Sequence, residues 1–148
     1  MELLSQEYFK IMDVISFYDG YLMTIKGWSI TIGMALIGYA FQQKNKSILL
    51  LCCVSSICFA LVDAKFKQYQ TSYYPRMQNI EVCINENKPS CPPLQVDSAW
   101  NKSKSQNSYL KQFSTAGVFM PHFIIFMLAL LLFFVPKSIE QNSQLTKT

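Results

Sequence analysis

The chain has 148 residues, of which 51% are hydrophobic, 14% aromatic and 15% charged, and its formal net charge is +4. This fraction of apolar residues is larger than a soluble domain of this length needs for its core, and together with the low net charge it excludes general disorder. Five glycines and six prolines exclude collagen-like and low-complexity chains, and the length excludes a two-domain enzyme. The composition therefore indicates a membrane protein.

Residues 1–20 are predicted to form an amphipathic helix outside the membrane. Their apolar residues recur at alternating spacings of four and three, which is the pattern of one helix face. The acidic residues mostly lie off that face. The apolar positions are Leu4, Tyr8, Ile11, Ile15, Tyr18 and Leu22.

Two apolar runs, 27–41 and 47–62, follow and are separated by only five residues. Each run alone would cover only about 24 Å, but extension to residues 21 and 66 brings both close to the roughly 20 residues of a membrane span. We therefore predict a two-span transmembrane hairpin over 21–66. The alternative is a hairpin buried in a soluble protein.

The hairpin geometry places Lys26 and Asp63 at one level. If the turn is centred on Lys44, residues whose numbers sum to about 88 lie side by side. Each charge would be costly alone near the bilayer, so we predict an ion pair that acts as a latch on the hairpin. In the alternative, the lysine reaches toward water and the two side chains never meet.

The connection over 67–114 is predicted to begin as an extension of the second helix that ends at Pro75. From 78 to 112 the composition favours a polar loop, with a short strand suggested at 80–84. The aromatic and basic side chains near the two spans are predicted to lie at the membrane interface. These are Trp28, Tyr69, Tyr73 and Arg76.

The third predicted span covers 115–136, and its only ionisable residue before Lys137 is His122. A polar tail, 137–148, follows. The fold class predicted from the sequence is an all-α integral membrane protein, consisting of a long antiparallel helical hairpin and a third transmembrane helix.

The five cysteines and the lysines bear on orientation. Cys52, Cys53 and Cys58 fall within a span, where we interpret them as packing residues. The side that holds the amino terminus and 64–114 carries nine Lys and Arg, against four on the other, so the positive-inside rule predicts that it is cytoplasmic. Cys83 and Cys91 would then be free thiols, whereas a periplasmic location predicts a disulfide between them.

Residues for catalysis are hard to find. His122 has no evident serine or carboxylate partner, so we interpret it as a packing residue and predict no catalytic residue and no enzyme activity. One histidine and a Cys83–Cys91 spacing outside the common zinc patterns predict no metal site, and no cofactor motif is present. The modest net charge argues against nucleic acid as a partner.

Small residues form two stripes suited to close helix packing within the bilayer. We predict that these stripes support either packing inside one chain only or, in addition, self-association into a homo-oligomer. The first stripe is Gly27, Thr31, Ala35 and Gly38, and the second is Cys52, Ser56 and Ala60.

The Lys26-Gly27-Trp28 run in the first span and Asp63-Ala64 in the second resemble a hairpin pattern of small bacterial membrane proteins, including the transmembrane effectors of anti-phage retron and cyclic-nucleotide systems. The match covers about residues 20–75. It implies an inner-membrane protein that self-associates and perturbs the membrane during defence. The alternative hypothesis is a non-catalytic membrane anchor or assembly subunit that binds a protein partner through 69–112.

Overall fold

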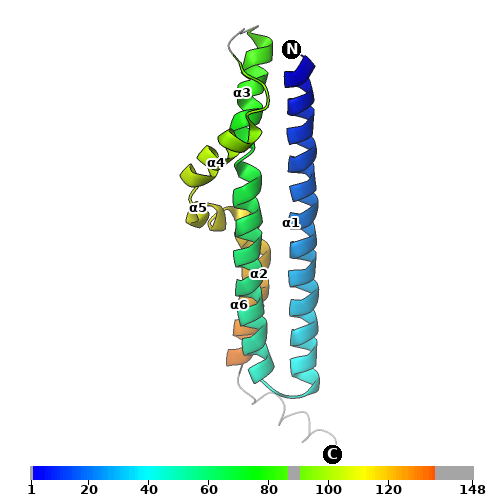
Figure 1. Ribbon diagram of the computed structural model, residues 1–148. Helices are drawn as coiled ribbons and strands as arrows, with labels where there is room; N and C mark the ends of the chain where they lie inside the picture. The colour runs from blue at the N-terminus through cyan, green and yellow to red at the C-terminus, as the bar shows by residue number, and fades with distance from the viewer. Residues whose placement is uncertain (1, 87–90, 136–148) are drawn as a thin grey trace, which may run out of the picture.

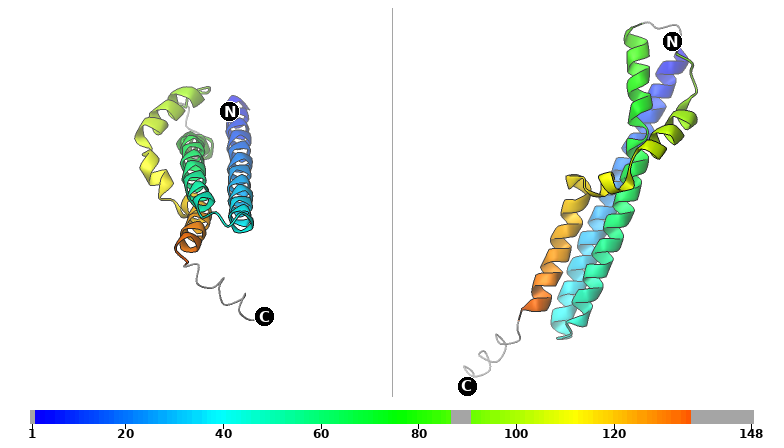
Figure 2. Two further views of the ribbon diagram at one scale, coloured as in Figure 1. Left: turned by 90° about the horizontal axis from the view of Figure 1, so that it is seen from below. Right: turned by 90° about the vertical axis from the view of Figure 1, so that its left-hand side faces the viewer.

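The computed structural model describes residues 2–86 and 91–135. Its backbone is a rod built on a helical hairpin, in which α1 (Glu2–Gln42) and α2 (Ser47–Thr71) run antiparallel side by side (Figure 1). α6 (Ala116–Phe134) lies against both helices along the half of the rod that contains the turn (Figure 2). The described residues are helical, with no strand among them.

Three helices are long and apolar enough to cross a membrane, as the sequence predicted. They comprise α1, the segment from α2 through α3, and α6. α6 has 19 residues and is therefore about 28 Å long, close to the thickness of one hydrocarbon core. The end of the rod near the turn, where all three helices run together, is the part suited to lipid.

The other half of the rod differs from the predicted polar loop. α3 (Tyr74–Asn85) continues the direction of α2 (Figure 1). α4 (Val96–Gln106) and α5 (Tyr109–Phe113) lie on the flank of the rod that α2 and α3 form. The prediction of a strand at 80–84 was therefore wrong, and so was the prediction of a loop where α3, α4 and α5 lie. Residues 91–95, between α3 and α4, are not helical. Residues 87–90 of the predicted loop and the predicted polar tail, 137–148, lie outside the described residues. Pro75 occupies the first turn of α3, where a backbone N–H has no partner within the helix, so its missing N–H costs no hydrogen bond. Pro75 therefore follows the end of α2 and also starts α3.

We call residues 2–20 together with α3, α4 and α5 the head. Its core brings the predicted stripe of α1 onto α3, and the buried members are Leu4, Ile11, Ile15 and Ile80. A second core near the turn joins α1, α2 and α6. Its buried members are Ile37, Ala40, Leu49, Cys52, Cys53, Ile125 and Ala129.

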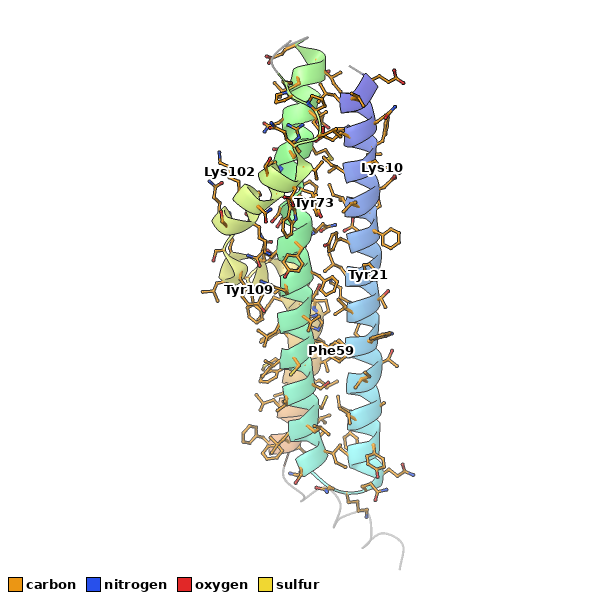
Figure 3. The ribbon with its side chains drawn as sticks, in the orientation of Figure 1. Lys10, Tyr21, Phe59, Tyr73, Lys102 and Tyr109 are labelled. Carbon is orange, nitrogen blue, oxygen red and sulfur yellow. A yellow bond between two sulfur atoms is a disulfide. The ribbon has the colours of Figure 1, made fainter. Side chains whose placement is uncertain are left out.

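The predicted register of the hairpin is confirmed. Lys26 contacts Asp63, the Gln70 side-chain amide donates to the carbonyl oxygen of Ile15, and the rings of Tyr18 and Tyr73 lie 6.1 Å apart. Figure 3 shows Tyr21 on the α1 side of the hairpin and Tyr73 higher on the opposite side. Polar contacts therefore separate the two apolar cores along the hairpin.

Candidate functional site: a buried charge network

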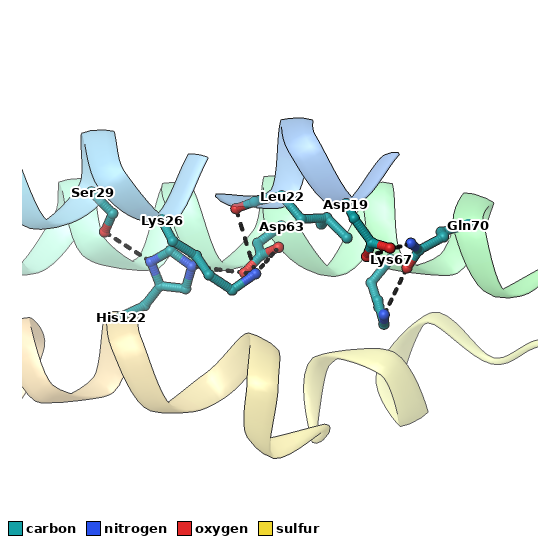
Figure 4. A network of polar contacts seen from close by, with 8 residues as sticks. All are labelled: Asp19, Leu22, Lys26, Ser29, Asp63, Lys67, Gln70 and His122. Atoms are coloured by element: carbon teal, nitrogen blue, oxygen red, sulfur yellow. Dashed lines mark hydrogen bonds and ion pairs between the residues drawn. The ribbon is translucent and has the colours of Figure 1, made fainter. Parts of the chain in front are cut away.

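Three helices contribute side chains to one buried polar network. Lys26 Nζ lies 3.0 Å from Asp63 Oδ2 and 3.1 Å from Oδ1, which places α1 and α2 in direct ionic contact. His122 Nε2 on α6 lies 3.1 Å from the same Asp63 Oδ2, and His122 Nδ1 lies 2.8 Å from the hydroxyl of Ser29 (Figure 4). Asp63 therefore joins all three helices at one point.

The network lies among the three helices that are long and apolar enough to cross a membrane. His122 is six residues inside α6, about 9 Å along the axis from its first residue. Asp63 is fully buried, and His122 and Ser29 are each only 2% exposed. Among the described residues, no buried side-chain nitrogen or oxygen lacks a hydrogen-bond partner. A buried carboxylate is tolerated only when it is paired in this way, so the bundle and the network depend on each other.

Sequence reasoning found the Lys26–Asp63 pair and missed the other two members. The sequence predicts a packing role without an evident partner for His122, but in the structure its ring contacts both a carboxylate and a hydroxyl. The one available signal was that His122 is the only ionisable residue in an otherwise apolar span. Its partners depend on how α6 docks on the hairpin, which no local pattern encodes.

Ser29, His122 and Asp63 are the residue types of an acyl-transfer triad, but their setting does not suit that chemistry. Ser29 is buried in the interior of α1, where the neighbouring backbone N–H groups bond within the helix and leave no oxyanion site. Asp63 is also shared with Lys26. The arrangement is better suited to holding charge, or a proton, between three helices.

A second buried ion pair lies in the head. Arg76 donates from Nε and Nη2 to the two carboxylate oxygens of Glu7, at 2.8 and 3.0 Å. Arg76 Nη2 also donates to the carbonyl oxygen of Pro92, and the Leu94 N–H donates to Glu7 Oε2 at 2.8 Å. Arg76, which we predicted at the membrane interface, is therefore a buried residue that joins α1, α3 and the segment before α4.

A disulfide joins Cys83 on α3 to Cys91, which lies just before that segment. It thus ties the backbone at Pro92 and Leu94 close to α3 and supports the Glu7–Arg76 pair. Glu7 lies outside the span that the sequence predicts for α1. Burial raises the pKa of its carboxyl, but the hydrogen bonds from Arg76 and from the Leu94 backbone outweigh burial and hold the pKa below its ordinary value.

The predicted packing stripe of α1 faces away from the bundle. Gly27, Thr31, Ala35 and Gly38 are all exposed, and nothing lies within 4 Å of where a Cβ on Gly27 or Gly38 would stand. The face that packs is instead formed by other residues, because the Lys26–Asp63 pair and the close approach of α6 set the rotation of α1. Its buried members within the span are Leu22, Ser29, Gly33, Ile37 and Ala40.

Gly33 marks the close approach of α6, since a Cβ there would stand 2.5 Å from Ile125 Cγ2. On α2, the predicted stripe does pack inside the chain, and Cys52, Ser56 and Ala60 are all buried. Cys52 Sγ lies 3.5 Å from the carbonyl oxygen of Gly33, and Ser56 donates to the carbonyl oxygen of His122.

The remaining predicted interface residues lie on two sides of the rod. Trp28 is 62% exposed on the outer surface of α1. The Tyr69 and Tyr73 rings lie 5.8 and 5.9 Å from the Trp100 ring of α4. Among the described residues, no group of three or more His, Cys, Asp or Glu side chains is arranged to hold a metal ion.

No family model, curated protein or solved structure matches this chain. The resemblance to anti-phage membrane effectors therefore stays a prediction from the residues that carry it.

Proposed function

We propose that this protein is a three-span membrane protein that self-associates and perturbs the bilayer, with Lys26, Asp63 and His122 as the latch that keeps each bundle closed. The buried network carries the proposal. Ionisable side chains within spans are costly, and they mark positions where a membrane protein moves charge or changes state. Loss of Asp63 would leave Lys26 without a counter-charge in an apolar layer and would remove the Nε2 partner of His122.

The outer face of α1 supports self-association. Small and polar exposed residues continue the predicted stripe toward the head, and the spacings along the whole stripe are three or four residues. A shallow hollow lies on the same face, lined in part by Ser16, Gly20 and Thr24. Small residues let helix backbones approach closely in lipid. The full stripe is Asp13, Ser16, Gly20, Thr24, Gly27, Thr31, Ala35 and Gly38.

Leucine substitution on this face tests the proposal. In Gly27→Leu/Gly38→Leu, we expect the fold to persist because both positions face open space. We expect association, measured as particle mass by light scattering in mild detergent, to weaken at least about tenfold, as for the loss of one close helix contact of about 1.4 kcal/mol. Dye release from vesicles should fall with it.

Gly33→Leu is the matched control, because that side chain would collide with Ile125 and should destabilise the bundle by at least about 1–3 kcal/mol. An oligomer of unchanged mass in Gly27→Leu/Gly38→Leu would contradict an interface on this face. An oligomer that dissociates while dye release stays at the wild-type level would contradict a self-assembled membrane-perturbing unit.

The alternative function, an anchor for a protein partner, is favoured by the head. Within the region 69–112, α3 packs against α1 and α5 against α2, and Leu94 has 77% of its surface exposed. Crosslinking separates the two functions. One stoichiometric heterologous partner without a homo-oligomer would favour the anchor.

The disulfide supports an orientation opposite to the one that lysine counting predicts. We place the head in an oxidising compartment and the Gln42–Lys46 turn in the cytoplasm, because structural disulfides persist in oxidising compartments. Two of the nine basic residues counted for the head side, Lys26 and Arg76, are held in ion pairs inside the protein. The count therefore exceeds the free positive charge on that side.

Thiol labelling checks this orientation. Protein taken from cells under acid quench and then denatured should take up three maleimide labels, on Cys52, Cys53 and Cys58, and five after reduction. In intact cells, an impermeant maleimide should label Ser98→Cys in the head and spare Gln43→Cys at the turn. Five labels without reduction, or the reverse pattern of surface labelling, would restore the cytoplasmic head.

A further inference from the structure

Two lysines and three aromatic rings form a cluster where the head meets the membrane-spanning half. Lys65 Nζ lies 5.2 Å from the centre of the Tyr69 ring and 5.6 Å from that of Tyr109. Lys104 Nζ lies 4.9 Å from the Tyr69 ring and 4.6 Å from the Trp100 ring. We call Lys65, Tyr69, Trp100, Lys104 and Tyr109 the basic shelf.

The basic shelf is a built structure because hydrogen bonds fix α4 and α5 to α2. Trp100 Nε1 donates to the carbonyl oxygen of Tyr69 at 3.2 Å, and the Tyr109 hydroxyl donates to that of Leu61 at 2.8 Å. Between them, the Gln68 amide donates to the carbonyl oxygen of Asn107 at 2.7 Å. The three rings are therefore held in place before any ligand arrives.

The position of the basic shelf along the rod follows from the helix that comes next in the chain, α6. α5 leads within a few residues into α6, so it lies where the third span begins (Figure 1). Figure 3 shows Tyr109 on the flank of the rod at this junction. Leu110, beside it in α5, has 73% of its surface exposed. An exposed leucine next to lysines and tyrosines is the pattern of a surface that lies among lipid headgroups.

The charges of the shelf are unbalanced. Both ammonium groups approach the same Tyr69 ring, and within the ranges 2–86 and 91–135 neither has a carboxylate at ion-pair distance. Lys65 donates to the neutral Gln68 Oε1 at 3.0 Å. Lysine ammonium groups without an acidic partner attract anions, and the oxygens of a phosphate group accept hydrogen bonds from such ammonium groups.

We propose that the basic shelf binds the phosphate of an anionic phospholipid headgroup. The location at the start of α6 favours a lipid over a soluble phosphate. A choline headgroup fits less well, because an ammonium group of Lys65 or Lys104 already lies over each of the three rings and would repel a further cation. This proposal does not depend on self-association.

The test uses the full chain reconstituted in mixed vesicles of phosphatidylcholine and phosphatidylglycerol, extracted gently and analysed by native mass spectrometry. We expect retained lipid to be enriched in phosphatidylglycerol. Near a membrane each lysine contributes about 1 kcal/mol to the binding of anionic lipid, which corresponds to about a fivefold change in affinity. Lys65→Gln/Lys104→Gln should therefore lower the enrichment of phosphatidylglycerol roughly 25-fold.

Two variants control for charge and fold. Lys102→Gln removes one charge from the same helix without a ring contact and should keep the enrichment, and Lys65→Arg/Lys104→Arg should keep it because arginine retains both the charge and the ring contact. Equal retention of both lipids, or unchanged enrichment in Lys65→Gln/Lys104→Gln, would overturn the proposal. Stabilisation of the protein by inorganic phosphate in phosphatidylcholine alone, to the extent that phosphatidylglycerol gives, would overturn the lipid assignment.

Discussion

The Asp63→Ala variant should lose about 3–5 kcal/mol of unfolding free energy, since it removes one partner from a buried ion pair and leaves Lys26 without its counter-charge. His122 loses its Nε2 partner in the same substitution. Unfolding of the full chain in detergent, followed by far-ultraviolet circular dichroism, measures the loss. Asp97→Ala, at an exposed position in α4, is the matched control and should change stability by less than about 0.5 kcal/mol.

The same variant separates a latch from a purely structural contact. If the network holds the bundle closed, then Asp63→Ala and Lys26→Ala should raise dye release from vesicles at protein levels where the wild type is silent. Lys26→Ala should have the smaller effect, because His122 Nε2 still contacts Asp63 Oδ2 when Lys26 is absent. Wild-type dye release in both variants would remove the latch, and a wild-type melting curve for Asp63→Ala would contradict the network itself.

Glu7→Ala should have the second large effect, a loss of about 3–5 kcal/mol from the stability of the head. Arg76 would keep its burial and its bond to Pro92 but lose both carboxylate bonds, and the Leu94 N–H would lose its acceptor. Protease digestion of the head in reconstituted vesicles, read by mass spectrometry, measures the loss. Glu2→Ala, at the exposed start of α1, is the control.

A double variant shows whether the charges or their pairing matter. Glu7→Leu/Arg76→Met should be more stable than either single substitution, because two apolar side chains replace a buried charge pair without leaving one charge alone. Additive losses from the two substitutions would contradict direct pairing of Glu7 and Arg76.

The head should also weaken in acid. Because the folded pKa of Glu7 is below its unfolded value, its ion pair contributes full stability above the unfolded pKa, and this contribution is lost as the pH falls through the folded pKa. Glu7→Gln should remove that part of the pH dependence.

The hairpin could be predicted because its signals are local. Charge-free runs fix the spans, the short turn fixes the register, and the register places Lys26 beside Asp63. The rotation of α1 about its axis could not be predicted, since small residues suit either a face buried within the chain or a face toward another copy. In the structure, the docking of α6 near Gly33, together with the Lys26–Asp63 pair, distinguishes the two faces.

The helices of the head were missed for a different reason. α4 is short and polar and α5 has only five residues, so neither sequence has a strong intrinsic preference for helix. They are held by distant groups, through Trp100 to the carbonyl of Tyr69 and through Gln68 to the carbonyl of Asn107. Such long-range bonds leave no periodic pattern in the sequence.

The central claim is that lipid surrounds the half of the rod that contains α6, and Cys58 allows a direct measurement of it. Cys58 is the one exposed cysteine among the three described free thiols, and it lies on α2 five residues from Asp63. A nitroxide placed on it before reconstitution reports collisions with oxygen, which concentrates in lipid, and with a nickel chelate, which stays in water. We predict high oxygen and low nickel accessibility at Cys58 and the reverse at Ser98→Cys in the head; nickel accessibility at Cys58 equal to that in the head would contradict a membrane-spanning bundle.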